Sequence, residues 1–205
     1  SMGLPNARRF GERTLIYHCY DEIGAAVWAA KHGHYLEKEY MPLVDGVVVT
    51  SKGLLDAKKA YNPNTELVRN GVNFDLFHQG FSSEISPKKI IGYIGSIDTR
   101  LDYPLLEVLF ARYPEYSFEF VGRTTYPEGE ERLKKHPNVK VLGPRNATEL
   151  PEFLKTCSAG IIPFARNEFT KGIYPLKINE YLTAGLPVVM TEFSDLSEFT
   201  DVVSK

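Results

Sequence analysis

The sequence predicts an α/β protein with a doubly wound parallel sheet, preceded by a partial second α/β domain. Short runs rich in β-branched residues alternate with longer segments of helical period along nearly the whole chain, which is typical of parallel α/β folds. Most of the short runs are too apolar to leave one face in water, as expected of strands covered on both sides. The 205 residues, 43% of them hydrophobic, are enough to form a sizeable core without disulfides or a structural metal.

The expected elements follow from this alternation and from signals at their ends. Strands are expected near residues 14–18, 46–50, 67–69, 89–94, 117–121, 139–142, 159–162 and 187–190. Helices are expected around residues 26–40, 51–61, 104–113, 148–157 and 175–184. Ser51 and Thr148 can cap helix N-termini, Pro175 suits a first helical position, and Gly185 can take the left-handed conformation that ends a helix. A strand–helix series of this kind predicts a Rossmann-like sheet.

The domain organisation follows from one stretch that interrupts the alternation of strands and helices. Residues 73–88 have no sustained period and contain glycine, serine and proline, as interdomain connectors do. We therefore expect a partial domain over residues 1–75, a linker over 76–88 and a second domain over 89–205. Three strands are too few for the first domain, and after a possible helix start at 195–199 no closing helix follows. We expect a fragment, whose residues 1–3 resemble an expression tag.

Composition excludes several classes of protein. The chain carries 24 Lys plus Arg against 26 Asp plus Glu, a net charge of -2, which argues against nucleic acid as a partner. Its longest apolar runs, residues 45–50 and 89–95, fall short of the roughly 18 residues that span a bilayer. Cys19 and Cys157 stand singly in apolar segments, so we expect buried free thiols and a cytoplasmic protein. The five histidines form no metal motif, and His32 and His34 are expected on an exposed face.

Ligands of open parallel sheets bind beyond the carboxyl ends of the strands, so the loops that follow each strand are candidate sites. Three of these loops combine glycine with a following arginine. The cations could converge on one rim or face solvent separately, and the residues alone leave both interpretations open. The spacing GxGxxG of nicotinamide-dinucleotide sites is absent. The candidate residues are Gly95, Ser96 and Arg100 in the first loop, Gly122 and Arg123 in the second, and Gly143, Pro144 and Arg145 in the third.

A fourth loop leads into a helix with a charged first turn. Lys177 falls where free backbone N–H groups and the helix dipole already attract anions, which indicates a phosphate site. Glu180 lies one turn deeper on the same face, where its carboxylate could accept hydrogen bonds from a ribose diol. The alternative is an exposed Lys/Glu pair that contributes a few tenths of a kcal/mol.

The segment 175–189, Pro-Leu-Lys-Ile-Asn-Glu-Tyr-Leu-Thr-Ala-Gly-Leu-Pro-Val-Val, resembles the nucleotide-sugar signature of GT-B glycosyltransferases. It is most similar to the bacterial branch of the family 4, or group 1, type. Residues 17–22, 45–51 and 69–77 resemble the end of that family's N-terminal domain, and residues 91–95 resemble the first strand of its donor-binding domain. Against this family, the chain lacks most of the acceptor-binding domain and the C-terminal helices that cross back over it.

The resemblance implies roles for individual residues. Arg100 and Lys177 correspond to the catalytic cations on the donor diphosphate, and Glu180 to the carboxylate on the ribose. The donor-binding loops correspond to Gly95 and Ser96, to Gly122 and Arg123 beside the phosphates, and to Gly143 and Pro144 at the base. The family's first glutamate falls on Gly172, so the usual contact to the transferred sugar is missing and the donor sugar stays open. Asp21 lies near the cleft in related folds, but an Asp after a strand is equally suited to cap a helix, and we assign it no catalytic role.

The resemblance also implies an activity. We expect a cytoplasmic glycosyltransferase whose donor is a nucleoside-diphosphate sugar, with UDP as its nucleotide. The expected acceptor is a saccharide or a lipid-linked molecule. The family resemblance implies retention at the anomeric carbon. Catalysis is expected to need no metal, because no DxD motif is present, and no cofactor is expected. Peripheral membrane association of the intact enzyme is compatible with this family, and the fragment alone is expected to be inactive. The alternatives are a UDP-sugar 2-epimerase of the same fold, a non-catalytic nucleotide-sugar-binding domain and, more remotely, a nicotinamide-dependent oxidoreductase.

Overall fold

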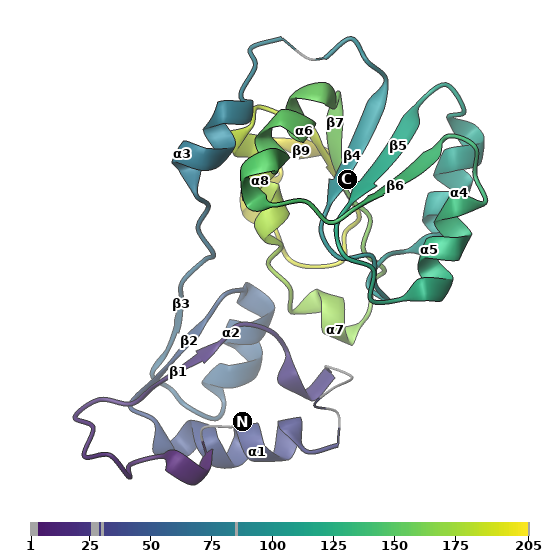
Figure 1. Cartoon of the computed structure of the whole chain (residues 1–205). Helices are drawn as coiled ribbons and strands as arrows, with labels where there is room; N and C mark the ends of the chain where they lie inside the picture. Colours follow the sequence, from purple (N-terminus) through teal and green to yellow (C-terminus); the bar gives the residue numbers. More distant parts are fainter. Residues whose placement is uncertain (1–3, 26–28, 30, 85, 205) are drawn as a thin grey trace. The chain divides into compact units, whose positions relative to one another are not determined.

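The computed structural model describes residues 4–25, 29, 31–84 and 86–204, and these residues form two compact units (Figure 1). The first unit contains the described residues up to Asn70 together with Arg166–Tyr174 and Phe193–Asp195. The second contains the described residues of Gly71–Ala165, Pro175–Glu192 and the chain from Leu196 onward. The contacts place the boundary after Asn70, because the segment that follows already packs in the second unit through the buried ring of Phe77.

The first unit is built on a three-stranded parallel sheet in the order β1-β2-β3. Tyr17 of β1 lies opposite Val47 of β2, which in turn lies opposite Thr65 of β3. The elements of this unit are η1 (Leu4–Asn6), β1 (Ile16–Cys19), η2 (Ile23–Ala25), α1 (Gly33–Tyr40), η3 (Met41–Leu43), β2 (Gly46–Val49), α2 (Lys52–Lys59), β3 (Thr65–Leu67) and α7 (Glu168–Lys171).

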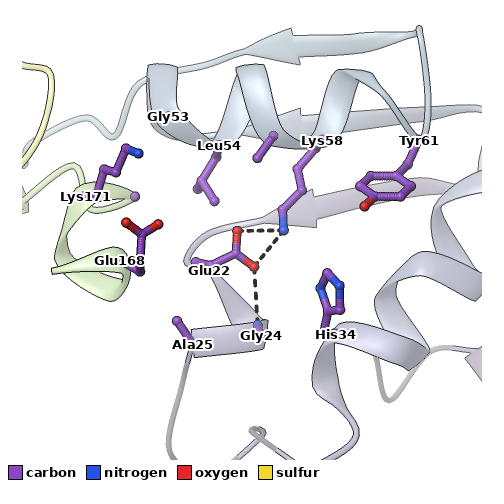
Figure 2. A pocket seen from close by; sticks show the side chains of 12 residues that line it. Glu22, Gly24, Ala25, His34, Gly53, Leu54, Lys58, Tyr61, Glu168 and Lys171 are labelled. Atoms are coloured by element: carbon purple, nitrogen blue, oxygen red, sulfur yellow. Dashed lines mark hydrogen bonds and ion pairs between the residues drawn. The ribbon is translucent and has the colours of Figure 1, made fainter.

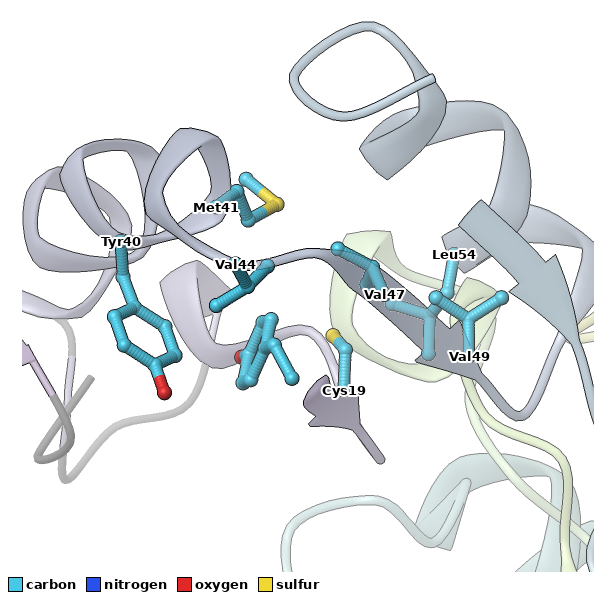
Figure 3. Packing of buried hydrophobic residues seen from close by; sticks show 8 residues of the cluster. Cys19, Tyr40, Met41, Val44, Val47, Val49 and Leu54 are labelled. Carbon is cyan, nitrogen blue, oxygen red and sulfur yellow. The ribbon is translucent and has the colours of Figure 1, made fainter. Parts of the chain in front are cut away.

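A small apolar core holds the first unit together (Figure 3). Its buried members are Tyr17, Cys19, Tyr40, Met41, Val44, Val47, Val49 and Leu54. The side chain of Ser51 caps α2 by accepting a hydrogen bond from the backbone N–H of Leu54 at 3.2 Å, as predicted. The cap fixes the first turn of α2, from which Leu54 reaches this core.

The second unit is a six-stranded parallel sheet in the order β6-β5-β4-β7-β8-β9. Counted along the chain, this is the strand order 3-2-1-4-5-6 of the doubly wound Rossmann fold, which confirms the predicted fold class. Helices α4 and α5 lie on one side of the sheet, and α6 and α8 lie on the other (Figure 1).

The elements of the second unit are α3 (Phe74–Phe77), η4 (His78–Gly80), β4 (Ile90–Ile94), α4 (Tyr103–Arg112), β5 (Ser117–Val121), α5 (Pro127–Lys134), β6 (Val139–Gly143), η5 (Ala147–Glu149), α6 (Leu150–Thr156), β7 (Ala159–Ile162), α8 (Leu176–Thr183), β8 (Val188–Met190), η6 (Ser197–Phe199) and β9 (Val203–Ser204).

Aromatic rings form much of the core between the sheet and α4. The Phe110 ring lies edge-on to Phe118, with 4.8 Å between ring centroids, and also contacts Phe120 at 6.3 Å. Phe120 in turn meets Tyr93 of the neighbouring strand at 5.4 Å. These buried rings secure β4 and β5, whose carboxyl ends carry the candidate loops.

Several elements differ from the sequence-based expectation. Helix α5 was not predicted, because its sequence Pro-Glu-Gly-Glu-Glu-Arg-Leu-Lys has one large apolar side chain, Leu133, and therefore no apolar period. Strand β9 was not predicted either, and of the expected helix start at residues 195–199 only Ser197–Phe199 is helical, as the short 3-10 helix η6. Helix α1 begins at Gly33, whereas part of the expected helix, residues 26–28 and 30, lies outside the described residues.

The helix ends also bring two corrections. Thr148 is not the cap before α6: Asn146 and Glu149 form a reciprocal capping box around η5. Pro175 is itself the N-cap of α8, so the helix begins at Leu176. Gly185 has the predicted left-handed conformation, with φ of +73°. Cys19 and Cys157 are buried free thiols, as predicted.

No described helix combines the length and apolar character that crossing a membrane requires.

Candidate functional site

The candidate site lies at the switch point of the second unit, where the strand order reverses between β4 and β7. The ladder between these strands pairs Ile91 with Ala159 and Gly92 with Gly160, and it ends there. Beyond this point the carboxyl ends of the two strands are no longer paired with each other. Doubly wound sheets bind their ligands in the crevice that such a divergence opens.

Tyr181 of α8 fills the gap between the diverging strands. Its hydroxyl accepts a hydrogen bond from the backbone N–H of Ile94 at 2.9 Å and donates to the carbonyl of Ile161 at 3.4 Å. The fully buried ring lies against Gly160, where a Cβ atom would approach it to 2.6 Å. The pair Gly160 and Tyr181 therefore docks α8 against the end of β4.

Glycines at the ends of β4, β5 and β6 bring three loops together. The N–H of Gly95 donates to the carbonyl of Val121, and the N–H of Gly122 donates to the carbonyl of Gly143, each at 2.9 Å. A Cβ atom on Gly122 would overlap the Gly95 carbonyl oxygen, so only glycine fits at this position. The loops present closely packed backbone at the carboxyl edge of the sheet.

These loops line a hollow of about 400 Å³, a volume typical of small-molecule sites. Six of the candidate loop residues line it: Gly95, Ser96, Gly122, Arg123, Pro144 and Arg145. Gly143 contributes through its hydrogen bond to Gly122. Arg123 and Arg145 both line the hollow, so two of the three loop arginines do converge on one rim.

Arg100 and Lys177 meet over one aromatic ring beside the Gly95 loop. The Lys177 ammonium lies 4.7 Å from the centroid of the Phe164 ring, and the Arg100 guanidinium lies 5.2 Å from the same centroid. A Cβ atom on Gly95 would lie 3.3 Å from Lys177 Nζ, which places the ammonium against that loop. The predicted pair of cations is therefore brought together, and Phe164 is the platform that both contact.

Asp98 orients Arg100 within this arrangement. The guanidinium donates to both carboxylate oxygens of Asp98, with Nη2 to Oδ2 at 2.6 Å and Nε to Oδ1 at 2.9 Å. The same Oδ1 atom accepts a hydrogen bond from the backbone N–H of Arg100 at 2.9 Å. Asp98 thus restricts the conformations of the guanidinium and partly offsets its charge.

Burial shifts the acid–base properties of the α8 residues. It lowers the pKa of Lys177 to about 8, and the nearby charge of Arg100 acts in the same direction while Glu180 opposes it. Burial also raises the pKa of Glu180, which the charge of Lys177 opposes. Both side chains are half-buried, which contradicts the alternative of an exposed Lys/Glu surface pair.

Gly172, the position of the family's first glutamate, ends α7 and lies in the first unit. Its carbonyl accepts a hydrogen bond from the Ser51 hydroxyl at 2.7 Å. Within residues 4–25, 29, 31–84 and 86–204, no group of three or more His, Cys, Asp or Glu residues is placed to hold a metal ion.

Sequence reasoning missed four residues of the site: Tyr93, Asp98, Phe164 and Tyr181. Three of them carried a usable signal, because Asp98 and Phe164 lie in the loops that follow buried strands and Tyr181 follows Glu180 in the helix signature. Tyr93 had no such signal, because it lies within strand β4, and only tertiary packing brings the Lys177 ammonium to 5.4 Å from the centroid of its ring.

Comparison with known protein families identifies the family of this chain. Residues 88–203 match the family model described as glycosyl transferases group 1. This match covers more than half of the chain, and the chain therefore belongs to that family, as the sequence resemblance predicted.

Particular relatives extend the comparison. The chain is 29% identical over 142 residues to a putative teichuronic acid biosynthesis glycosyltransferase, TuaH, of Bacillus subtilis, and the match covers 64% of this chain and 35% of that protein. Its fold is similar to that of Anabaena HepE, solved with UDP and glucose, with a TM-score of 0.72, 16% identity and coverage of 95% of this chain and 57% of that one. It is also similar to the catalytic domain of Arabidopsis thaliana starch synthase IV, solved with ADP and acarbose, with a TM-score of 0.59, 13% identity and coverage of 96% and 60%. The chain thus spans about a third of the curated relative, and the structural likeness shows the GT-B fold.

Proposed function

We propose that the second unit binds a nucleoside-diphosphate sugar with UDP as its nucleotide, and that the whole protein transfers the glycosyl group to a hydroxyl of a saccharide or lipid-linked acceptor. One observation carries the proposal: Lys177 and Arg100 meet beside the Gly95 loop at the switch point of the sheet. Membership of the group 1 family supports the reaction class. The UDP and ADP in the HepE and starch synthase structures support a nucleotide ligand.

The proposal gives each part of the site a role. Lys177, Arg100 and the first turn of α8 hold the diphosphate, and Gly95 and Ser96 bring backbone close to it. Glu180 accepts hydrogen bonds from the ribose. The base lies at Gly143 and Pro144, with Gly122 and Arg123 beside the phosphates, and these residues line or adjoin the 400 Å³ hollow.

The chemistry that these groups supply is electrostatic. As the bond to the anomeric carbon breaks, negative charge develops on the departing diphosphate, and preorganised cations in a partly buried site stabilise it. We assign this stabilisation to Lys177, Arg100 and the helix dipole. Removing one of these cations from the whole enzyme should lower the rate by about 10²- to 10³-fold.

Three further parts of the proposal follow from the family resemblance and from the cysteines. Transfer proceeds with retention at the anomeric carbon. The charge stabilisation needs no metal, because the two cations and the backbone dipoles supply it. The protein acts in the cytoplasm, where the buried free thiols of Cys19 and Cys157 suit a reducing environment.

Calorimetric titration of the chain with UDP, GDP, ADP and NAD tests the donor site. We expect selective binding of UDP that Lys177→Ala and Glu180→Ala each abolish or strongly weaken. Lys155→Ala is the matched control, because Lys155 pairs with Glu152 on the exposed surface of α6. Undiminished binding in the two site variants would contradict the placement of the site. Failure of every nucleotide to bind would contradict the proposed donor unit.

The reaction itself is tested with the whole protein. Free UDP together with a new glycoside is the expected outcome. An epimerised sugar would assign the protein to the 2-epimerases instead, and donor binding without turnover would identify a non-catalytic nucleotide-sugar-binding protein.

A further inference from the structure

The Lys177 ammonium contacts two aromatic rings and has no hydrogen-bond partner. It lies 4.7 Å from the centroid of the Phe164 ring and 5.4 Å from that of the Tyr93 ring. Within the part of the chain that the structure describes, it forms no hydrogen bond and no ion pair. The side chain is half-buried, and buried polar groups in proteins nearly always have such partners. All three N–H donors of Lys177 are therefore available to a ligand.

Lys58, a buried lysine of the first unit, is held in the opposite way. Figure 2 shows its ammonium bonded to the carboxylate of Glu22. It donates to both oxygens of Glu22 and to Oε2 of Glu37, each at 2.8 Å, so all three donors are used. Burial lowers the pKa of Lys58, but these hydrogen bonds raise it, and the net effect is an increase. No carboxylate does the same for Lys177, so its charge must be held in place by other contacts.

The Phe164 ring is fixed beside Arg100 by the backbone on either side of it. The N–H of Ala165 donates to the carbonyl of Arg100 at 2.7 Å, and the N–H of Asp102 donates to the carbonyl of Pro163 at 2.8 Å. The ring itself is only 1% exposed. The loop after β7 and the start of α4 thus hold this ring rigidly between them.

An aromatic face attracts cations without taking up a hydrogen-bond donor, because its partial negative charge is spread over the ring. Phe164 attracts the ammonium of Lys177 and also the guanidinium of Arg100, whose centre lies 5.2 Å from the ring centroid. This attraction offsets part of the repulsion between the two like charges. A carboxylate in its place would occupy the donors of Lys177 and reduce its charge, as Asp98 does for Arg100.

We propose that Phe164 is a positioning residue of the donor site. Its ring, assisted by that of Tyr93, holds the two cations side by side for the diphosphate and leaves every N–H donor of Lys177 to the phosphate oxygens. The inference rests on the proposed function, since it takes a diphosphate as the ligand. Phe164 acts through Lys177 and Arg100, so the state of these cations is what an experiment must follow.

The protonation of Lys177 reports on the ring. Burial lowers the pKa of Lys177 to about 8, and the charge of Arg100 acts in the same direction. The charges of Glu180 and Asp98 oppose this decrease. Attraction to the Phe164 ring favours the ammonium, so a weaker attraction should lower the pKa further. Fluorine on the ring withdraws charge from its face and changes its size little, so that the burial of the ammonium is kept.

Carbon-13 NMR of the full chain, with lysine labelled at Cε, follows this titration without any ligand. The Lys177 signal is identified by its loss in Lys177→Arg. We expect its titration midpoint to fall stepwise when Phe164 is replaced by 3,5-difluorophenylalanine and then by 3,4,5-trifluorophenylalanine. The total fall should be about 0.4 to 1.5 pH units, the range for a cation–π contact. The same replacements at Phe118, a buried ring of β5, are the control and should leave the midpoint unchanged.

Calorimetric titration of the same proteins with UDP tests the link to the ligand. At pH 9.5 a lower midpoint leaves less of the ammonium, so trifluorophenylalanine at position 164 should weaken UDP binding by about 3- to 30-fold. At pH 6.5 Lys177 is largely charged in every protein, and the affinity should change by about twofold or less. A ring that served packing alone would change the affinity equally at both pH values.

Three results would overturn the inference: a Lys177 midpoint that does not fall on fluorination of Phe164, an equal fall in the Phe118 control, or an equal loss of UDP affinity at both pH values. A falling midpoint without UDP binding at either pH would contradict the donor proposal but retain Phe164 as the residue that holds Lys177. Binding of UDP with an unchanged midpoint would retain the donor proposal and contradict the role of Phe164.

Discussion

Lys177 is the residue whose chemistry depends most on its surroundings. In the unfolded chain its pKa is close to the ordinary value of 10.5, and in the folded protein burial and Arg100 lower it to about 8. Under the proposed function, a diphosphate bound at Lys177 would favour the charged ammonium. We therefore expect UDP to bind most tightly below pH 8 and to lose affinity as the pH rises above 8, by up to about tenfold per pH unit.

Calorimetry between pH 6.5 and pH 9.5 checks this expectation. Buffers of different ionisation enthalpy should also reveal proton uptake on binding near pH 8 and above. In Lys177→Arg the side chain stays charged throughout this range, so its affinity should be nearly independent of pH. A wild-type affinity that is equally flat would show that Lys177 does not titrate in contact with the diphosphate.

The Tyr181 hydroxyl is the second residue-scale feature with a measurable consequence. Tyr181→Phe leaves the buried N–H of Ile94 without its partner, and we expect a loss of about 1–3 kcal/mol in the free energy of unfolding. Urea denaturation gives this value, with the exposed Tyr113→Phe as the control. Equal stability of the two variants would mean that water replaces the hydroxyl between the strands.

At the scale of elements, we predict that alanine substitutions in two glycine-bearing loops differ in their cost to stability. In Gly122→Ala the new methyl group overlaps the Gly95 carbonyl, and we expect destabilisation of about 1–3 kcal/mol or more together with loss of UDP binding. Gly143 also has a positive φ, of +74°, but no atom lies within 4 Å of a Cβ there, so Gly143→Ala should cost only about 1–2 kcal/mol. Thermal unfolding of both variants tests this order, and a reversal would contradict the packing of the β4 and β5 loops.

The elements themselves were predictable to different degrees, for physical reasons. Strands β4, β5 and β7 were predicted nearly to the residue because each is a short run rich in apolar residues that lies between turns. Helix α5 was missed because its buried contacts, those of Leu133 and of Gly129 under the Tyr103 ring, involve too few apolar residues to make a period. The cap before α6 was misplaced by two residues, since Asn146 and Thr148 both have capping side chains and their sequence does not decide between them.

At the scale of the whole molecule, the two compact units predict a localised response to ligand. UDP at a hundred times its dissociation constant should stabilise the unit that binds it by about 2.7 kcal/mol. Native-state hydrogen exchange should show this added protection in β4, β5 and β7 of the second unit and little change in β1–β3 of the first. Equal protection in all these strands would show that the units unfold together.

The sequence by itself determined the alternation of strands and helices, the place of Lys177 in the first turn of a helix and the family signature of residues 175–189. These features are local, because each depends on neighbours within a few turns of the chain. Only the tertiary structure decided that Arg100 and Lys177 share the Phe164 ring, that Tyr181 bridges the parted strands, and that Glu22 joins the buried Lys58. Such contacts join residues that are far apart in sequence. They are determined by the order of the strands and by the packing of loops at the sheet edge, and the local pattern of apolar residues contains no information about either.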